Sequence, residues 1–265
     1  MVATGERPTP ESVTADTVRR YNDQGFIHLP GVLPKEEVKR YREAAEALFE
    51  REGRQIWGAS EREVQIHYVE AAWRKDEAMR DLALHPVITE IAERLAGGPL
   101  RLYGTDVLMK EPEEHLPTVV HDDEPGLPLS NLSRTLTAWT PLVDVPAERG
   151  CLTYIPGSHL RPDADRQIHL TGFSEYRPME DIWPDYSWQP RVTVPVRAGD
   201  VVFHHFRTVH LADVNRSDEP RIAYGVVYMD ADAVYRPGVQ DHPVAHLEPG
   251  QPVGGESFPL IRAQR

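Results

Sequence analysis

Apolar residues in the first hundred positions recur at helical spacing. They predict three helices and one short strand, at about 16–22, 35–51, 76–96 and 26–29. Asp16 is the expected cap of the first helix, and Pro86 is expected to break the third. The clearest repeat lies in the second helix and consists of Val38, Tyr41, Ala45, Leu48 and Phe49.

From Leu100 onward the pattern changes to short β-branched or aromatic segments separated by turn residues. Candidate strands lie at 100–110, 117–122, 133–143, 150–155, 191–196, 200–206, 208–214 and 220–229. Many short strands with turn signals between them are typical of a sandwich or barrel. Because the helices precede the strands, we expect a mainly β fold whose core is buttressed by N-terminal helices.

A single domain is expected from residue 13 to residue 265, after a disordered tail at 1–12. Within it, residues 13–98 are expected to be mainly helical support and residues 99–230 the β-core. The segment 231–265 is assigned as a C-terminal extension without a predicted role.

An insert at residues 160–190 interrupts the predicted strands. Its aromatic residues, separated by prolines, are Phe173, Tyr176, Trp183, Tyr186 and Trp188. Long irregular segments in compact domains often cover a binding site, so we expect a substrate lid here. The alternative is a poorly ordered surface loop, which so many aromatic residues disfavour.

Composition limits the possible partners of the 265-residue chain. The formal net charge of -13 disfavours binding to nucleic acid, because an acidic surface repels phosphates. No apolar run is long enough for a membrane span, and the N-terminus lacks a signal-peptide pattern. A single cysteine, Cys151, excludes an internal disulfide and fits the cytoplasm. The oligomeric state is not indicated.

A His-x-Asp pair at His121 and Asp123 is the first candidate for metal chemistry. In a strand, residues two apart share a face, so both side chains would point to one place. Two histidines and one carboxylate on one face of iron(II) leave positions open for other ligands. By itself the pair is also compatible with a solvated turn. The similar pair His246-x-Glu248 lies in a Pro/Gly-rich segment without an obvious third ligand.

A second candidate element surrounds His210 and Arg221. The turn signal Asn215-Arg216-Ser217-Asp218 between them predicts a hairpin in which they lie opposite each other, about 5 Å apart at Cβ. On the face of Arg221 the alternate residues are small, namely Ala223, Gly225 and Val227. Such an arginine needs a carboxylate partner, either in a ligand or within the protein. The pattern alone favours neither.

Jointly, several motifs resemble the phytanoyl-CoA dioxygenase family of iron(II)/2-oxoglutarate oxygenases. The resemblance runs from about Val18 to Met229. It is carried by the opening segment 21–33, the Pro-Gly-Ser-His element at 156–159, and the signature from Gly199 through His210, Asn215, Ser217 and Arg221.

This resemblance implies a double-stranded β-helix, the jelly-roll core of cupin-like proteins. It also implies that His121, Asp123 and His210 bind iron(II), which then reacts with O₂. Arg221 would bind the distal carboxylate of the co-substrate 2-oxoglutarate. Trp139 matches a tryptophan that lines the co-substrate pocket in relatives. Thr137, on the same strand face, is a weaker candidate for a hydrogen bond to the co-substrate.

The implied activity is oxidation of a small-molecule metabolite, with succinate and CO₂ as co-products. Hydroxylation is the default, and epimerisation, cyclisation or desaturation of a natural-product intermediate would begin with the same hydrogen abstraction. Because Asp123 is present, halogenation is disfavoured. Alternatives from other classes are a non-catalytic cupin-like binding protein and a zinc-dependent isomerase or hydrolase. The Arg- and Pro-rich composition fits a bacterial source.

Four basic residues near these motifs receive no ligand role. His159 is expected to stabilise its turn. His204 and His205 are adjacent, so at most one points inward. Lys110 receives no catalytic role, and no basic cluster suggests a CoA thioester as substrate.

Overall fold

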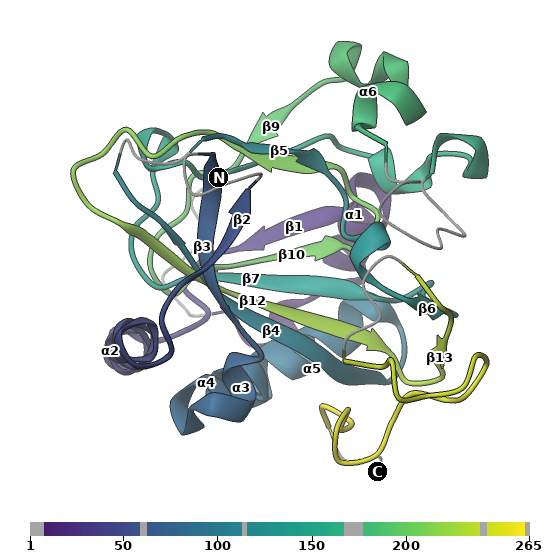
Figure 1. Cartoon of the computed structure of the whole chain (residues 1–265), viewed down its shortest axis with the longest axis horizontal. Helices are drawn as coiled ribbons and strands as arrows, with labels where there is room; N and C mark the ends of the chain where they lie inside the picture. Colours follow the sequence, from purple (N-terminus) through teal and green to yellow (C-terminus); the bar gives the residue numbers. More distant parts are fainter. Residues whose placement is uncertain (1–7, 59–62, 113–115, 167–176, 239–242, 263–265) are drawn as a thin grey trace.

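Two antiparallel sheets face each other in the computed structural model, which describes residues 8–58, 63–112, 116–166, 177–238 and 243–262. The large sheet has the strand order β1 (Phe26–Leu29), β10 (Val201–His205), β7 (Leu136–Pro141), β12 (Arg221–Asp230), β4 (Leu100–Lys110), β3 (Val64–Glu70) and β2 (Gln55–Gly58). The small sheet has the order β5 (Thr118–His121), β11 (His210–Ala212), β8 (Leu152–Tyr154) and β9 (Val192–Thr193). Figure 1 shows the small sheet above the large one, and the predicted jelly-roll core is confirmed.

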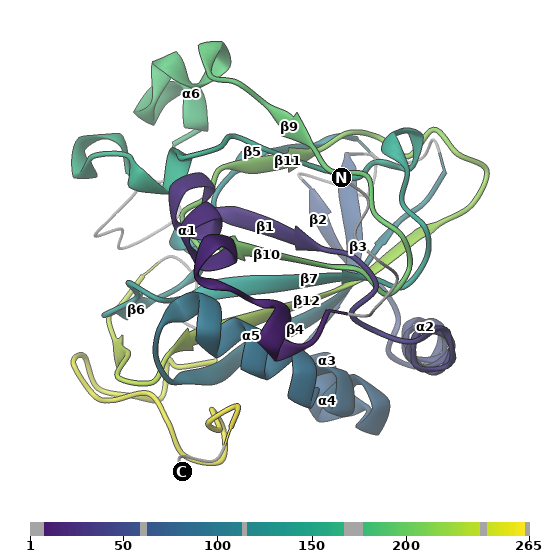
Figure 2. The same cartoon turned by 180° about the vertical axis from the view of Figure 1, so that it is seen from behind.

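Most of the α-helices cover the face of the large sheet that is turned away from the small sheet, whereas the short helix Met179–Ile182 lies on the side of the small sheet (Figures 1 and 2). The α-helices are α1 (Ala15–Gln24), α2 (Lys35–Glu52), α3 (Ala72–Lys75), α4 (Glu77–Ala83), α5 (Pro86–Ala96) and α6 (Met179–Ile182). Short 3₁₀ turns are η1 (Pro10–Ser12), η2 (Glu124–Gly126), η3 (Ala147–Arg149), η4 (Ser158–Leu160), η5 (Asp163–Asp165) and η7 (Pro184–Trp188). None of the described helices combines the length and apolar character that crossing a membrane requires.

Local signals set the ends of these helices. The cap of α1 is Thr14, whose side chain accepts a hydrogen bond from the Thr17 amide, so the prediction of Asp16 was wrong. Asp16 instead lies in the first turn, where its negative charge interacts favourably with the positive end of the helix dipole. Pro86 begins α5 and divides the predicted helix at 76–96, as expected.

Strand β12 shows how one segment serves both layers. Ile222, Tyr224, Val226 and Tyr228 pack against the helices. The Tyr224 and Tyr228 hydroxyls donate to the carbonyls of Met79 and Ala83 in α4. The buried rings therefore add apolar contact without leaving a hydroxyl unpaired.

The predicted hairpin between His210 and Arg221 is wrong. Strand β11 pairs with β5 and β8, whereas β12 pairs with β4 and β7, so these two residues belong to different sheets. The connection crosses from one sheet to the other. Asn215, which is fully buried in this connection, donates to the carbonyls of Lys110 and Glu219. Its turn chemistry thus fixes a crossover rather than a hairpin.

The N-terminal support contains more strand than expected, because β2 and β3 join β1 in the large sheet. Period-two alternation at Val64, Ile66 and Tyr68 was the signal for β3. At the chain start, Pro10–Ser12 form η1 and lie against α5, although they were assigned to the disordered tail.

The C-terminal segment closes one end of the core. Its strand β13 (Val234–Tyr235) pairs with β6 (Leu129–Ser130) in a separate two-stranded sheet. Further on, Ile261 donates its backbone amide to the Leu100 carbonyl at the start of β4. An apolar cluster beneath it includes Tyr103, Val253 and Phe258. The extension therefore belongs to the same folded core.

Candidate metal centre

Two histidines meet across the small sheet. The register of β5 and β11 places His121 directly opposite His210, with ring centroids 4.2 Å apart. One ligand atom from each of these residues and one from Asp123 all lie within 4.8 Å of one another. The three residues expected from the sequence therefore converge on one point.

Asp123 reaches this point by a different route from the one expected. β5 ends at His121, and Asp123 has helical backbone angles (φ -83°, ψ -8°) at the start of η2. Its amide donates to the carbonyl of Phe206 at 2.8 Å. A turn anchored to the opposite sheet, and not strand alternation, brings the carboxylate to the imidazoles.

Each imidazole has its Nδ1 at a carbonyl two residues earlier in the chain. The His121 Nδ1 lies 2.8 Å from the Val119 oxygen, and the His210 Nδ1 lies 2.9 Å from the Thr208 oxygen. With Nδ1–H donating, the lone pair is on Nε2. This is the usual way in which proteins orient a metal-binding histidine.

The carboxylate of Asp123 is held on one side. Its Oδ2 accepts a hydrogen bond from the Thr137 hydroxyl at 2.8 Å and lies 3.3 Å from the His204 Nε2. Its Oδ1 lies 3.9 Å from the His210 Nε2. Oδ2 therefore anchors the side chain, and Oδ1 faces the imidazoles.

His204 is a site residue that received no role from the sequence. Its Nδ1 lies 3.1 Å from the buried Tyr154 hydroxyl, so a chain of contacts runs from Tyr154 through His204 to Asp123. The alternation in β10 could have indicated this role. Val201 and Phe203 face the helices, so His204, which lies between alternate positions, faces the small sheet. Thr137 likewise contacts Asp123, so we now assign it a positioning role.

The protonation states fit a metal ligand set. Burial, reinforced by His121, lowers the pKa of His210 to about 3, and burial also lowers the pKa of His121. Burial would raise the pKa of Asp123, but the hydrogen bond from His204 and the nearby imidazoles outweigh it and lower that pKa. Near neutral pH the group thus offers two neutral imidazoles and an ionised carboxylate, as metal binding requires.

Two buried basic side chains lie side by side in the large sheet. Arg221 in β12 is directly opposite Lys110 in β4, with 1% and 0% of their surfaces exposed. The Arg221 guanidinium donates to the Gly150 carbonyl, and the Lys110 ammonium donates to the carbonyls of Leu116 and Asp213. Burial lowers the pKa of Arg221 to about 10, so the group stays charged at neutral pH.

No described ion pair provides Arg221 with a carboxylate, and its buried Nε lacks a hydrogen-bond partner among the described residues. Of the two partners considered from the sequence, a ligand carboxylate is therefore favoured over an internal ion pair. The guanidinium carbon lies 5.7 Å from the centre of the Trp139 ring. Trp139 is almost fully buried.

The predicted lid is partly outside the described residues, since Phe173 and Tyr176 fall there. Trp188 is 87% exposed, and Trp183 packs beside Ile155 and Val209. At the base of the insert, the guanidinium of Arg161 lies 5.2 Å from the Trp183 ring and donates to Asp122 at 2.6 Å. This buried ion pair links the insert to Asp122, which lies between His121 and Asp123 in the chain.

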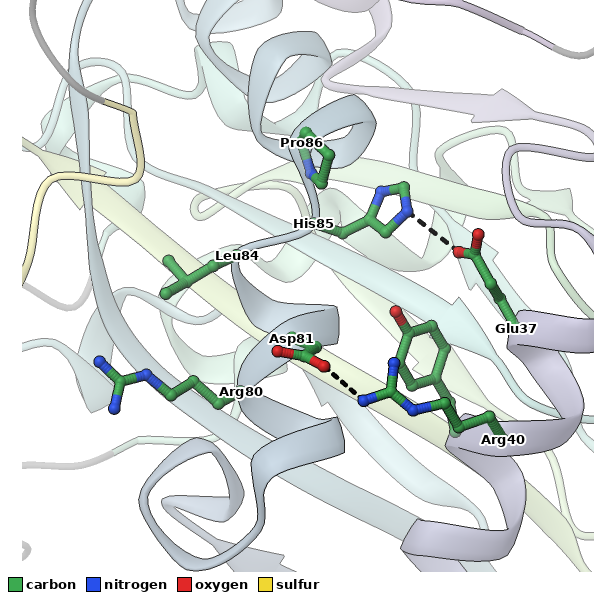
Figure 3. A pocket seen from close by; sticks show the side chains of 8 residues that line it. Glu37, Arg40, Arg80, Asp81, Leu84, His85 and Pro86 are labelled. Carbon is green, nitrogen blue, oxygen red and sulfur yellow. Dashed lines mark hydrogen bonds and ion pairs between the residues drawn. The ribbon is translucent and has the colours of Figure 1, made fainter.

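A hollow on the outer surface is separate from this centre. Figure 3 shows it between α2 and α4, with a volume of about 400 Å³. Four of its lining side chains form two pairs, Glu37 with His85 and Arg40 with Asp81, whereas Arg80 lies by the Trp73 ring. Such paired groups on an exterior surface suit helix packing better than ligand binding.

Comparison with known proteins places these features in context. The family model for phytanoyl-CoA dioxygenase (PhyH) matches residues 21–223. Phytanoyl-CoA dioxygenase domain-containing protein 1 of Mus musculus is 34% identical over 132 residues, which are 48% of this chain and 44% of that protein. The chain thus spans less than half the length of this curated relative.

Two solved structures are similar over nearly the whole chain. The α-ketoglutarate-dependent carbocyclase SnoK from nogalamycin biosynthesis is 60% identical, with a TM-score of 0.94 over 97% of this chain and 100% of that one. The epimerase SnoN, in complex with Fe³⁺, α-ketoglutarate and nogalamycin RO, is 44% identical, with a TM-score of 0.80 over 92% and 97%.

Proposed function

Because this chain belongs to the phytanoyl-CoA dioxygenase family, we propose that it is an iron(II)- and 2-oxoglutarate-dependent enzyme that oxidises a small natural-product intermediate. The observation that carries the proposal is the convergence of His121, Asp123 and His210 within one sandwich that also buries Arg221. A metal site alone would suit many functions. Here the metal site and the unpaired Arg221 face the same interior. A dicarboxylate could therefore bind the metal at one end and Arg221 at the other.

The residues of the chain would divide the work as follows. His121, Asp123 and His210 would hold iron, and Arg221 would bind the distal carboxylate of 2-oxoglutarate beside Trp139. Thr137 and His204 would keep one oxygen of Asp123 turned away from the metal. Bound iron and 2-oxoglutarate would supply the oxidising power that removes hydrogen from a substrate C–H bond.

The protein would also exclude water from this reaction. The ion pair between Arg161 and Asp122 holds the base of the 160–190 insert against the metal centre. We keep the insert as the proposed substrate lid, with Trp183 at its anchored end. Closing such a segment over the substrate would prevent side reactions.

Among the outcomes considered, we favour ring closure over simple hydroxylation. This preference rests on the 60% identity to a carbocyclase over nearly all of both chains. Ring closure removes two hydrogen atoms from the substrate, while O₂ and 2-oxoglutarate become water, succinate and CO₂. Epimerisation and hydroxylation would start with the same hydrogen abstraction and stay within the proposed class. A cytoplasmic location and the absence of nucleic-acid binding stay predictions.

The test is 2-oxoglutarate-dependent succinate formation in the presence of iron(II) and ascorbate, with intermediates of nogalamycin biosynthesis as candidate substrates. The mass of the product distinguishes the outcomes. Ring closure gives a product lighter by two hydrogens, hydroxylation one heavier by an oxygen, and epimerisation one of equal mass. A protein that binds iron but neither binds nor consumes 2-oxoglutarate would instead be a cupin-like binding protein.

A further inference from the structure

The strands β2 and β3, which were not predicted from the sequence, lie beside the metal centre and next to β4. In the register of β3 and β4, Val69 is opposite Val107, and both belong to the apolar cluster under the helices. Their neighbours Glu70 and Asp106 are opposite each other and lie on the reverse face, toward the small sheet. The outer strand β2 continues this face.

Trp57 in β2 brings an indole to the metal ligands. It is opposite Ile66, which shares the inward face of β3 with Glu70. The Trp57 ring centre lies 5.0 Å from that of His121, and the two rings are nearly perpendicular at 84°. Even so, Trp57 is 40% exposed, whereas Trp73 and Trp139 are almost fully buried. An indole beside a metal ligand is thus open to a molecule entering the site.

Glu70 and Asp106 place two carboxyl groups on the same face. Directly opposed like charges destabilise a sheet unless a proton or a cation lies between them. Within the described part of the chain, no hydrogen bond to either side-chain carboxylate is found. Burial, with the charges of Glu70 and Asp123 adding to it, raises the pKa of Asp106 to about 7, and the nearby charge of Lys75 opposes this shift without cancelling it.

The strand next to this pair carries a glycine and, beyond it, a tryptophan lies on the following strand. Across β12, the residue opposite Asp106 is Gly225, and beyond it lies Trp139. A Cβ at Gly225 would meet only ordinary contacts, the nearest at 3.6 Å, so close packing does not require glycine. Gly225 therefore presents no side chain on the face that carries the Asp106 carboxyl.

We propose that the inward face of β2, β3 and β4 is the substrate-binding wall, which takes a molecule with a flat ring on Trp57 and a protonated amine at Glu70 and Asp106. This inference rests on the proposed function, because it assigns the substrate class of the same site. A ring stacked on Trp57 would lie beside the metal ligand His121. The amine would neutralise the opposed carboxyl groups and fix the direction in which the substrate lies.

Three small probes separate the two parts of this wall. 1-(Aminomethyl)naphthalene has a flat ring and an amine, 1-naphthalenemethanol has the ring alone, and cyclohexylmethylamine has the amine alone. Calorimetric titration of each into the protein loaded with iron(II) and 2-oxoglutarate, under argon, gives the affinities. The same titrations without metal test the wall even if 2-oxoglutarate does not bind.

We expect the flat amine to bind more tightly than either partial probe. Trp57→Leu should weaken both naphthalene probes by about two- to tenfold, and Trp57→Phe should retain most of the affinity. Asp106→Asn should weaken the flat amine by about tenfold and leave the neutral naphthalene unchanged. Ile56→Ala, on the opposite face of β2, and Asp81→Asn, on the outer surface, are the matched controls.

Equal affinities of the flat amine and the neutral naphthalene would overturn the proposal, as would unchanged binding in Trp57→Leu. The proposal would also be overturned if Trp57→Leu weakened the binding of 2-oxoglutarate as much as it weakened the binding of the probes. That result would mean that Trp57 only supports His121. If the unmodified protein fails to bind 2-oxoglutarate but keeps the probe pattern, the proposed function fails and the wall stands.

Discussion

The two faces of β12 differ in almost every physical property. Toward the helices, Tyr224 and Tyr228 are fully buried, and their hydroxyls are paired with helix carbonyls. Toward the small sheet, Arg221 is equally buried but lacks a carboxylate partner among the described residues, and the next residues on its face are the small Ala223 and Gly225. Adjacent residues of β12 thus lie on two different faces, one that stabilises the fold and one that we propose binds a ligand.

This difference teaches where substitutions should act. A polar group that is buried and satisfied contributes to folding, whereas one that is buried and unpaired costs stability until a ligand arrives. Substitutions on the helix side should therefore change the free energy of unfolding. Those on the interior side should change metal and co-substrate binding.

The largest effect is expected from removing a metal ligand on the interior side. His210→Ala should weaken iron(II) binding by more than about a hundredfold, because loss of an outer hydrogen-bond partner alone costs up to that much. Anaerobic calorimetry with iron(II) measures this. His246→Ala, from the exposed His-x-Glu pair, is the control and should bind iron normally. Tight iron binding by His210→Ala would remove it from the ligand set.

Loss of a tyrosine from the helix side should mainly affect folding. Tyr224→Ala should lower the free energy of unfolding by about 3–5 kcal/mol, because it leaves a cavity between β12 and α4. Tyr224→Phe should cost only about 1 kcal/mol, for the lost hydrogen bond to Met79. Urea denaturation measures both. The contrast between the faces fails if the folded fraction of Tyr224→Ala has lost 2-oxoglutarate affinity.

A smaller effect is expected at the co-substrate end. Arg221→Ala should weaken 2-oxoglutarate binding by about ten- to a hundredfold, as expected for a charged hydrogen bond of about 1.5–3 kcal/mol. Arg221→Lys should recover part of the affinity, since it restores the charge but not the planar fork. Arg216→Ala on the surface serves as the control. Unchanged affinity in Arg221→Ala would refute the assignment.

The smallest effect, taken per pH unit, concerns the pH dependence of stability. Burial, with Arg221 adding to it, lowers the pKa of Lys110 from 10.5 to about 7. Between these values the unfolded chain carries a proton on Lys110 that the folded chain lacks, so its contribution makes stability rise with pH. The slope is at most about 1.4 kcal/mol per pH unit.

Denaturation of Lys110→Met at several pH values above about 7 tests this, and the rise should be flatter than in the unmodified protein. The exposed Lys39→Met is the matched control and should leave the slope unchanged. A slope in Lys110→Met equal to that of the unmodified protein would show that Lys110 stays charged in the fold.

Sequence patterns were reliable wherever the cause was local. Pro86 divided a helix, and the small residues that alternate with Arg221 marked one face of β12, because each effect depends on neighbouring residues. Pairing partners were predicted poorly. The hairpin between His210 and Arg221 was wrong, since a turn signal fixes a change of direction and not the sheet that receives the next strand.

By itself, the sequence determined the chemistry that is available: the residues at 121, 123, 210 and 221, and the family motifs around them. Only the tertiary structure decided how they meet, with His121 opposite His210 across the small sheet and Asp123 delivered by a turn. It also added His204 and the wall formed by Trp57, Glu70 and Asp106. The physical reason is that strand register and sheet pairing depend on contacts between distant segments, which one-dimensional spacing does not contain.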